Sequence, residues 1–228
     1  MDSTPAAQHG TLRVRFTAIG FMVGSFLFAL GVPLSLDSDL DPSVAGWTFF
    51  AGSVFFTTAG LLQFLSSREH AQPASGESSG GSWIGRKFHA RSLDWTASAI
   101  QLAGTLFFNV NTFRAATILD PTTAEVNRLV WAPDALGSIL FLVSSGIAFA
   151  PEVRWRRHRH ARNRSWAIGA LNLLGSVFFG LSAIGALLLP DTGSAVNVVW
   201  ANAGTFLGAV CFFVGAALLL PRRSHSSS

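Results

Sequence analysis

Charged residues are scarce in this sequence. Lysine and arginine together number 16 and aspartate and glutamate 12, so 12% of the 228 residues are charged, whereas soluble domains carry about a quarter. There is no tyrosine, and the single cysteine, Cys211, cannot form an internal disulfide. Half of the residues are hydrophobic, and phenylalanine alone numbers 20. This composition excludes a disordered chain, a disulfide scaffold and an ordinary soluble enzyme, and it indicates a polytopic membrane protein.

Six apolar segments are long enough to cross a ~30 Å hydrocarbon core as helices, which takes about 20 residues each. They cover roughly 15–34, 47–65, 95–118, 132–150, 166–189 and 200–221. No small-residue cleavage site follows the first segment, so we interpret it as a retained helix and not as a signal peptide. The sequence therefore predicts an all-α membrane protein with six transmembrane helices.

The basic residues are distributed unevenly between the two sides of these segments. The N-terminus, the 66–94 and 151–165 loops and the C-terminus hold 14 of the 16 lysines and arginines, and the alternate loops hold only Arg114 and Arg128. The positive-inside rule then places both termini in the cytoplasm. Lys87 is the only lysine, a bias that indicates a GC-rich bacterial genome, so we expect the bacterial cytoplasmic membrane. All seven tryptophans fall at segment ends or in loops, as an interfacial aromatic belt requires.

One motif recurs in every segment: a glycine, a phenylalanine four residues later, and a small or amide residue seven residues later. The six sets are Gly24-Phe28-Gly31, Gly52-Phe56-Ala59, Gly104-Phe108-Asn111, Gly137-Phe141-Ser144, Gly175-Phe179-Ser182 and Gly208-Phe212-Gly215. Small residues on one helix stripe allow close backbone approach in a membrane, so we expect these residues at helix–helix contacts. A stripe that lines a solute path is the alternative.

The last two pairs of segments align at an offset of 71 residues, which superposes Trp95 on Trp166 and Gln101 on Asn172. The first pair keeps the same plan with a shorter loop. We therefore expect three parallel two-helix hairpins around a pseudo-threefold axis. The predicted organisation is 1–14 N-terminus, 15–65 hairpin one, 66–94 flexible linker, 95–150 hairpin two, 151–165 basic loop, 166–221 hairpin three and 222–228 tail. Within the linker, 71–82 is rich in Ser, Gly, Ala and Pro.

The first hairpin runs from Phe21-Met-Val-Gly-Ser-Phe-Leu-Phe28 through an acidic loop to Gly46-Trp-Thr-Phe-Phe-Ala-Gly-Ser53. This resembles the YrhK-like family of small bacterial membrane proteins, and the third hairpin, from Asn172 to Pro221, is similar. The resemblance covers the hairpins but not the linker, and it implies no catalytic residues. This chain departs from the single-hairpin form by holding three hairpins.

No Asp, Glu, Lys, Arg or His falls in the central part of any segment, which is unfavourable for a proton-coupled carrier or a buried hydrolytic site. We therefore expect a non-enzymatic protein without cofactor, metal or nucleic-acid partner. His158 and His160 lie within a dense arginine cluster that opposes cation binding. The residues that this cluster offers to anionic lipid headgroups are Arg154, Arg156, Arg157 and Arg159.

The remaining polar candidates are amides. Gln101, Asn111 and Asn172 lie near the motif face on a helical wheel, so we expect them to point into the bundle. Bonds to neighbouring helices would indicate a packed scaffold that acts through lipid or partner contacts, which is our first hypothesis. Amides without protein partners would indicate a channel or facilitator for small solutes. We also expect an ion pair between Arg114 and Asp134; homo-oligomerisation stays open.

Overall fold

The structure is a computed structural model that describes residues 5–71, 82–156 and 164–221, with side chains over 10–68, 93–150 and 164–221. These ranges are helical apart from short connections. The helices are α1 (Pro5–Leu36), α2 (Pro42–Ala71), α3 (Ser82–Thr117), α4 (Thr123–Val126), the π-helix η1 (Asn127–Trp131), α5 (Ala132–Arg156), α6 (Arg164–Ala186) and α7 (Val198–Leu219). The all-α prediction is therefore confirmed for the part of the chain that is described.

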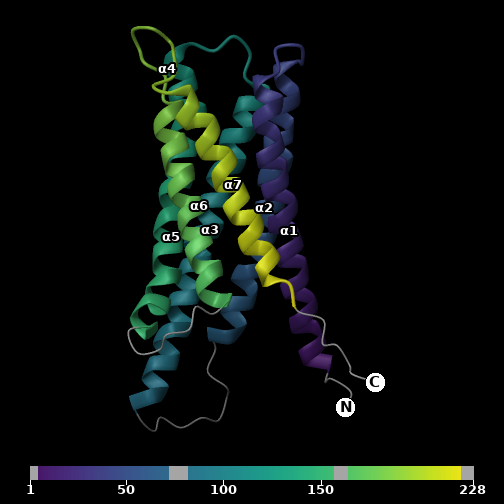
Figure 1. Cartoon of the computed structure of the whole chain (residues 1–228), viewed down its shortest axis with the longest axis vertical. Coiled ribbons are helices and arrows are strands. Elements are labelled where there is room, and N and C mark those ends of the chain that lie inside the picture. Colours follow the sequence, from purple (N-terminus) through teal and green to yellow (C-terminus); the bar gives the residue numbers. More distant parts are fainter. Residues whose placement is uncertain (1–4, 72–81, 157–163, 222–228) are drawn as a thin grey trace.

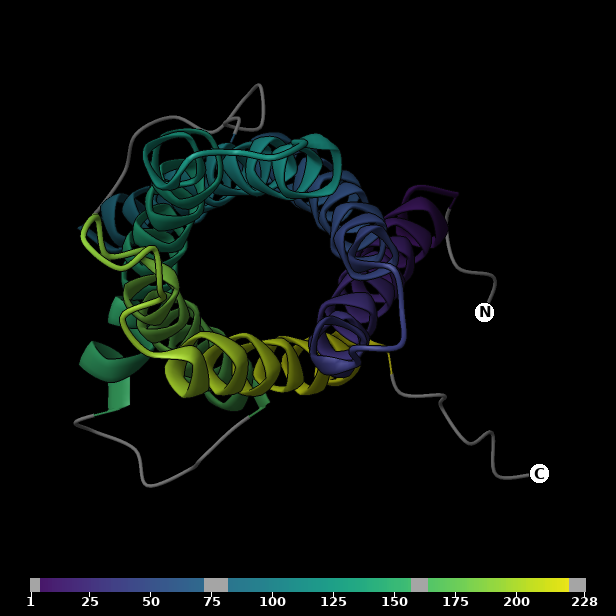
Figure 2. The same cartoon turned by 90° about the horizontal axis from the view of Figure 1, so that it is seen from above.

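The six long helices of the described residues form a closed ring, which Figure 2 shows from above. Each of α1, α2, α3, α5, α6 and α7 packs against the next, and α1 completes the ring by packing against α7. The starts of α1, α3 and α6 lie at one end of the ring, which we call the proximal end (Figure 1). The connections within the three hairpins lie at the opposite, distal end, where α4 and η1 lead into α5.

Five helical stretches are long and apolar enough to cross a membrane: Gly10–Leu36, Pro42–Arg68, Thr123–Ala150, Arg164–Ala186 and Val198–Leu219. The sequence predicted a sixth in α3. The described part of α3 carries Gln101, Asn109 and Asn111 together with several serines and threonines, and these polar side chains lower its mean hydropathy. Nevertheless, α3 occupies a full place in the ring, because it packs against α2 on one side and α5 on the other.

The helices extend past the expected segment ends at the proximal end. The predicted linker over 66–94 includes the end of α2, which reaches Ala71, and the start of α3 at Ser82. A helix satisfies its own backbone hydrogen bonds, so it can continue into polar sequence beyond an apolar segment. Residues 72–81 and 157–163, which include Arg157 and Arg159, lie outside the described residues, as do the side chains of Arg154 and Arg156.

Side-chain caps define where helices begin at the distal end. Asp41 precedes Pro42, the first residue of α2, and its Oδ1 accepts a hydrogen bond from the Ser43 amide at 2.8 Å. Asn197 caps α7 by accepting from the Trp200 amide at 3.0 Å. Short polar side chains at this position satisfy amides that the first helical turn leaves unpaired. The caps therefore fix the hairpin turns that align the helices of the ring.

Candidate functional site

The first glycines of the motif face each other in pairs inside each hairpin. The pairs are Gly24 with Gly52, Gly104 with Gly137, and Gly175 with Gly208. A Cβ added to any of the six would lie 2.9–3.2 Å from the carbonyl oxygen of its partner. Such a Cβ would also meet the motif phenylalanine of the partner helix; at Gly208 it would lie 2.6 Å from Phe179 Cδ1. Glycine is therefore needed at these positions for the close approach of the two helices.

The third motif positions make different contacts. Gly31 faces the Phe49 ring, and a Cβ on Gly215 would lie 3.0 Å from the Asn172 amide oxygen. Ser144 donates to the carbonyl of Ala97 on α3 at 2.8 Å. Ser182 donates to the carbonyl of Ala201 on α7, and Ala59 is fully buried. The third motif residues therefore pack or form hydrogen bonds at the contacts between neighbouring helices.

The six motif phenylalanines meet inside the ring. We call this cluster the phenylalanine layer: Phe28, Phe56, Phe108, Phe141, Phe179 and Phe212, one from each ring helix. All six are buried, with at most 6% of their surface exposed. Ring centroids of neighbouring members lie 5.1–6.5 Å apart, mostly in edge-to-face or tilted arrangements. The layer fills the ring with aromatic side chains contributed by every hairpin.

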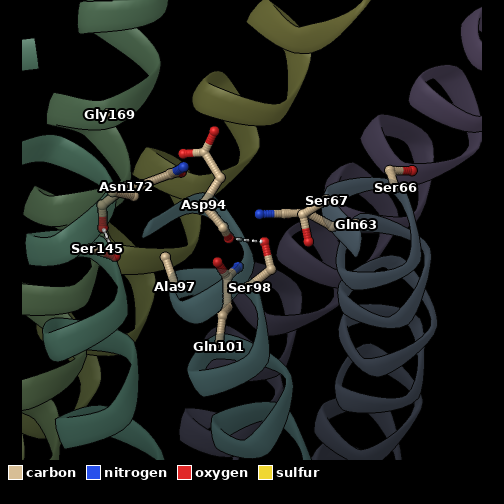
Figure 3. A pocket seen from close by; sticks show the side chains of 11 residues that line it. Gln63, Ser66, Ser67, Asp94, Ala97, Ser98, Gln101, Ser145, Gly169 and Asn172 are labelled. Carbon is tan, nitrogen blue, oxygen red and sulfur yellow. Dashed lines mark hydrogen bonds between the residues drawn. The ribbon is translucent and has the colours of Figure 1, made fainter. Parts of the chain in front are cut away.

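A cavity of about 300 Å³, with several polar side chains in its wall, lies on the proximal side of the phenylalanine layer. We call it the proximal cavity. Its wall includes Gln63 of α2, Asp94, Ser98 and Gln101 of α3, Ser145 of α5 and Asn172 of α6 (Figure 3). A smaller pocket continues toward the layer between Gln63, Gln101, Asn172 and Phe212. The polar surface of the ring interior therefore extends to the aromatic cluster.

Three amide side chains, Gln63, Gln101 and Asn172, line both of these spaces. None of the three makes a side-chain hydrogen bond to another residue in the described ranges; the Asn172 bonds to Ser145 and Ser176 use its backbone carbonyl. Gln101 and Asn172 therefore point into the bundle, as the helical wheel predicts. Their amides face the cavity, and no side chain of the described residues bonds to them.

A second interior pocket, of about 20 Å³, lies on the distal side of the layer. We call it the distal pocket. Phe28, Phe108 and Phe179 form part of its wall, and Asp134, Ser138, Ser182 and Thr205 supply the polar part. The sequence analysis considered Asp134 only as a partner for Arg114. Asp134 precedes Gly137 by one helical turn, so the two residues share a face, and this brings the carboxyl into the ring.

Asp134 interacts with the side chain of Asn111, the third expected interior amide. Arg114 lies exposed on α3, and within the described residues no ion pair joins it to Asp134. The expected ion pair is thus absent. Asn111 is half-buried, whereas Arg114, one helical turn further along α3, is exposed.

Hydroxyl groups connect neighbouring hairpins. Ser53 and Thr112 join α2 to α3 with their oxygens 3.0 Å apart, and Ser145 and Ser176 join α5 to α6 at 2.8 Å. Asn109, which lies off the motif face, donates to Thr57 of α2 at 2.9 Å. These contacts supplement the glycine seams, which operate within hairpins.

Sequence reasoning missed Gln63 and Asp94. Gln63 was included in an apolar segment, and Asp94 was assigned to the linker. The repeat offers a sequence signal for the position of Gln63, which follows Gly52 by eleven residues. The equivalent residues after Gly137 and Gly208 are Ala148 and Leu219. Ala148 lines the proximal cavity and Leu219 lines the smaller pocket, so these positions of the three even-numbered segments all contribute to the interior walls.

The exterior of the ring is apolar, with large exposed side chains that include Phe16, Phe26, Leu106, Ile139 and Ile184. Together with five helical stretches of sufficient length and apolarity, this surface is compatible with a helical integral membrane protein. No protein-family model matches the chain, and no curated protein or solved structure does either.

Proposed function

We propose that the protein is a membrane channel or facilitator for small polar solutes, closed at the phenylalanine layer. The observation that carries the proposal is the order of features in the ring: the proximal cavity with three amides that have no hydrogen-bond partner among the described residues, the aromatic layer, and the distal pocket. Amides that can donate and accept replace part of a hydration shell, and apolar constrictions can gate a path by excluding water.

The proposed setting is the bacterial cytoplasmic membrane, with the proximal end in the cytoplasm. The arginine-rich proximal loops support this orientation. In this proposal α3 is a sixth span whose polar side chains are tolerated because they face the interior or a neighbouring helix. The glycine pairing that recurs in each hairpin supports three repeats around a pseudo-threefold axis. The proposed relation to the YrhK-like family rests on the sequence motifs alone.

The test is solute flux into liposomes that contain the purified protein. Osmotic swelling with urea and glycerol, and ion flux with sodium and potassium, would be compared for the wild type, Phe141→Ala and Phe113→Ala. Phe141 is 1% exposed within the layer, whereas Phe113 is 43% exposed on the exterior of the ring. The proposal expects faster flux only for Phe141→Ala. It also expects Gln101→Leu, added to Phe141→Ala, to slow that flux.

A non-enzymatic scaffold that acts through lipid or partner contacts is the second candidate. The dense packing of the phenylalanine layer favours it, because buried aromatic contacts and glycine seams are what a static bundle requires. The proposed partners are then the bilayer and, through the arginines at 154, 156, 157 and 159, anionic headgroups. If liposomes with Phe141→Ala and with Phe113→Ala remain equally impermeable, and anionic lipids alter the protein's stability, the scaffold hypothesis is supported and the channel hypothesis is rejected.

A further inference from the structure

The polar side of the distal pocket consists of oxygen atoms. Asp134 of α5 contributes a carboxyl, and Ser138, Ser182 and Thr205 contribute hydroxyls from α5, α6 and α7. Ser138 and Ser182 are buried, with 3% and 8% of their surface exposed. The described residues thus bring one carboxyl and three hydroxyls from three helices together beside the phenylalanine layer.

The hydroxyl protons are already used within the protein. Ser182 donates to the Ala201 carbonyl at 2.6 Å and Thr205 donates to the same oxygen at 2.9 Å, while their own oxygens lie 2.7 Å apart. Whichever of the two donates to the other, neither proton remains for the pocket. Ser138 directs its proton to the Phe179 carbonyl over 3.4 Å. The three hydroxyls therefore present only lone pairs to an occupant of the pocket.

A group of acceptors needs a positively charged or strongly donating occupant. The pocket volume of about 20 Å³ exceeds the roughly 10–15 Å³ needed to hold one water-sized particle. Oxygen ligands suit hard cations, and the single carboxyl balances one positive charge. A divalent ion would leave an uncompensated charge in an apolar surrounding, which is costly. The volume admits one water-sized occupant, and the charge of the carboxyl favours a monovalent alkali cation over a neutral water molecule.

We infer that the distal pocket is a binding site for one monovalent alkali cation of the size of sodium, held by Asp134, Ser138, Ser182 and Thr205. A role of this site in binding the permeating solute rests on the proposed function. If the protein is a channel, the site implies that the permeating solute is a cation. Occupancy itself does not depend on transport. The cation neutralises the carboxyl that α5 brings into the ring, beside the side chain of Asn111.

The experiment measures equilibrium binding of radioactive sodium to the purified full chain in detergent, with choline as the inert replacement cation. Thermal unfolding is followed in sodium, potassium and choline, because a cation that binds only the folded state raises Tm. Asp134→Asn keeps the shape of the side chain and removes its charge. Asp191→Asn is the matched control, since Asp191 is exposed in the α6–α7 connection. Ser138→Ala is a second test that leaves the carboxyl intact.

We expect saturable sodium binding and a higher Tm in sodium than in choline for the wild type and Asp191→Asn. Asp134→Asn should lose both, and Ser138→Ala should weaken binding. If the wild type binds no sodium, or Asp134→Asn binds it as the wild type does, the inference is overturned. If Asp134→Asn does not fold, an unchanged sodium affinity of Ser138→Ala would overturn the assignment of the cation to the distal pocket. Sodium binding without flux in Phe141→Ala would refute the channel alone, and urea or glycerol flux without sodium binding would refute the cation site alone.

Discussion

Gly104 and Gly137 face each other across the α3–α5 hairpin in a nearly symmetric contact. A Cβ on either residue would lie 3.2 Å from the carbonyl oxygen of the other. Each glycine also adjoins a phenylalanine of the opposite helix, so that a Cβ on Gly104 would lie 2.7 Å from Phe141 Cδ1 and one on Gly137 would lie 3.3 Å from Phe108. The glycine seam and the phenylalanine layer are thus a single packing unit.

Gly104→Ala should destabilise the protein. The added methyl group would press on the Phe141 ring, which cannot move away because four other rings of the layer surround it. Overpacking of this kind costs roughly 1–3 kcal/mol, more than the roughly 0.5–1 kcal/mol that alanine gains over glycine within a helix. Thermal unfolding in detergent measures the net loss.

Gly146→Ala provides the control, because Gly146 lies in α5 with no atom within 4 Å of an added Cβ. That variant should be as stable as the wild type or more so. If Gly104→Ala were as stable as Gly146→Ala, the close packing of α3 against α5 at Gly104 would be contradicted.

The motif predicted which residues share a face, but it did not predict that six phenylalanines would meet. The recurrence of Gly104 and Phe108 on one stripe follows from helical periodicity, which can be read from the sequence. Whether a stripe faces one neighbouring helix or the centre of a ring depends on how many helices form the ring and on the angles at which neighbouring helices cross. That information lies in long-range packing of α1 against α7, which no local spacing encodes.

Phe141→Ala should lower stability more than Phe113→Ala. Phe141 contacts Phe108 and Phe212 at centroid distances of 5.1 and 5.7 Å and is almost fully buried, so its removal leaves a cavity. Loss of a buried phenylalanine costs about 3–5 kcal/mol in soluble cores. We expect a smaller cost here, because unfolding within a membrane or micelle does not expose the ring to water. Equal Tm values for the two variants would contradict the packing role of the layer.

The Ser145–Ser176 hydrogen bond should contribute a small coupling energy between α5 and α6. The two oxygens are 2.8 Å apart and both residues are buried. A double-mutant cycle with Ser145→Ala, Ser176→Ala and the double variant isolates this term. Interhelical bonds in membrane proteins average about 0.6 kcal/mol, so we expect a coupling near that value. A coupling indistinguishable from zero would mean that packing alone joins the two helices.

Asp41 should make the α1–α2 turn sensitive to acid. The Ser43 backbone amide, followed by the Ser43 side chain, lowers the pKa of the Asp41 carboxyl by hydrogen bonding to its charged form. A carboxyl whose pKa is lower in the folded state stabilises that state above its unfolded value of about 3.9. This stability is lost as the pH falls through the lower folded pKa.

Asp41→Asn retains an acceptor for the Ser43 amide but does not titrate, so its stability should change less with pH below about 4. Tm measured against pH for both proteins checks this. Parallel curves for the two proteins over that range would rule out Asp41 as a source of acid sensitivity.

Asn127 should anchor the distal connection of the third hairpin to the second. Its amide nitrogen donates to the Leu188 carbonyl at 2.8 Å, and its amide oxygen accepts from the Leu188 amide at 3.0 Å. Asn127→Ala removes both partners from a partly buried backbone, which costs roughly 1–3 kcal/mol. Hydrogen exchange at the Leu188 amide should accelerate and Tm should fall. Arg128→Ala, an exposed neighbour in the same π-helix, is the control; exchange at Leu188 that is equally slow in both variants would show that Asn127 does not hold the connection.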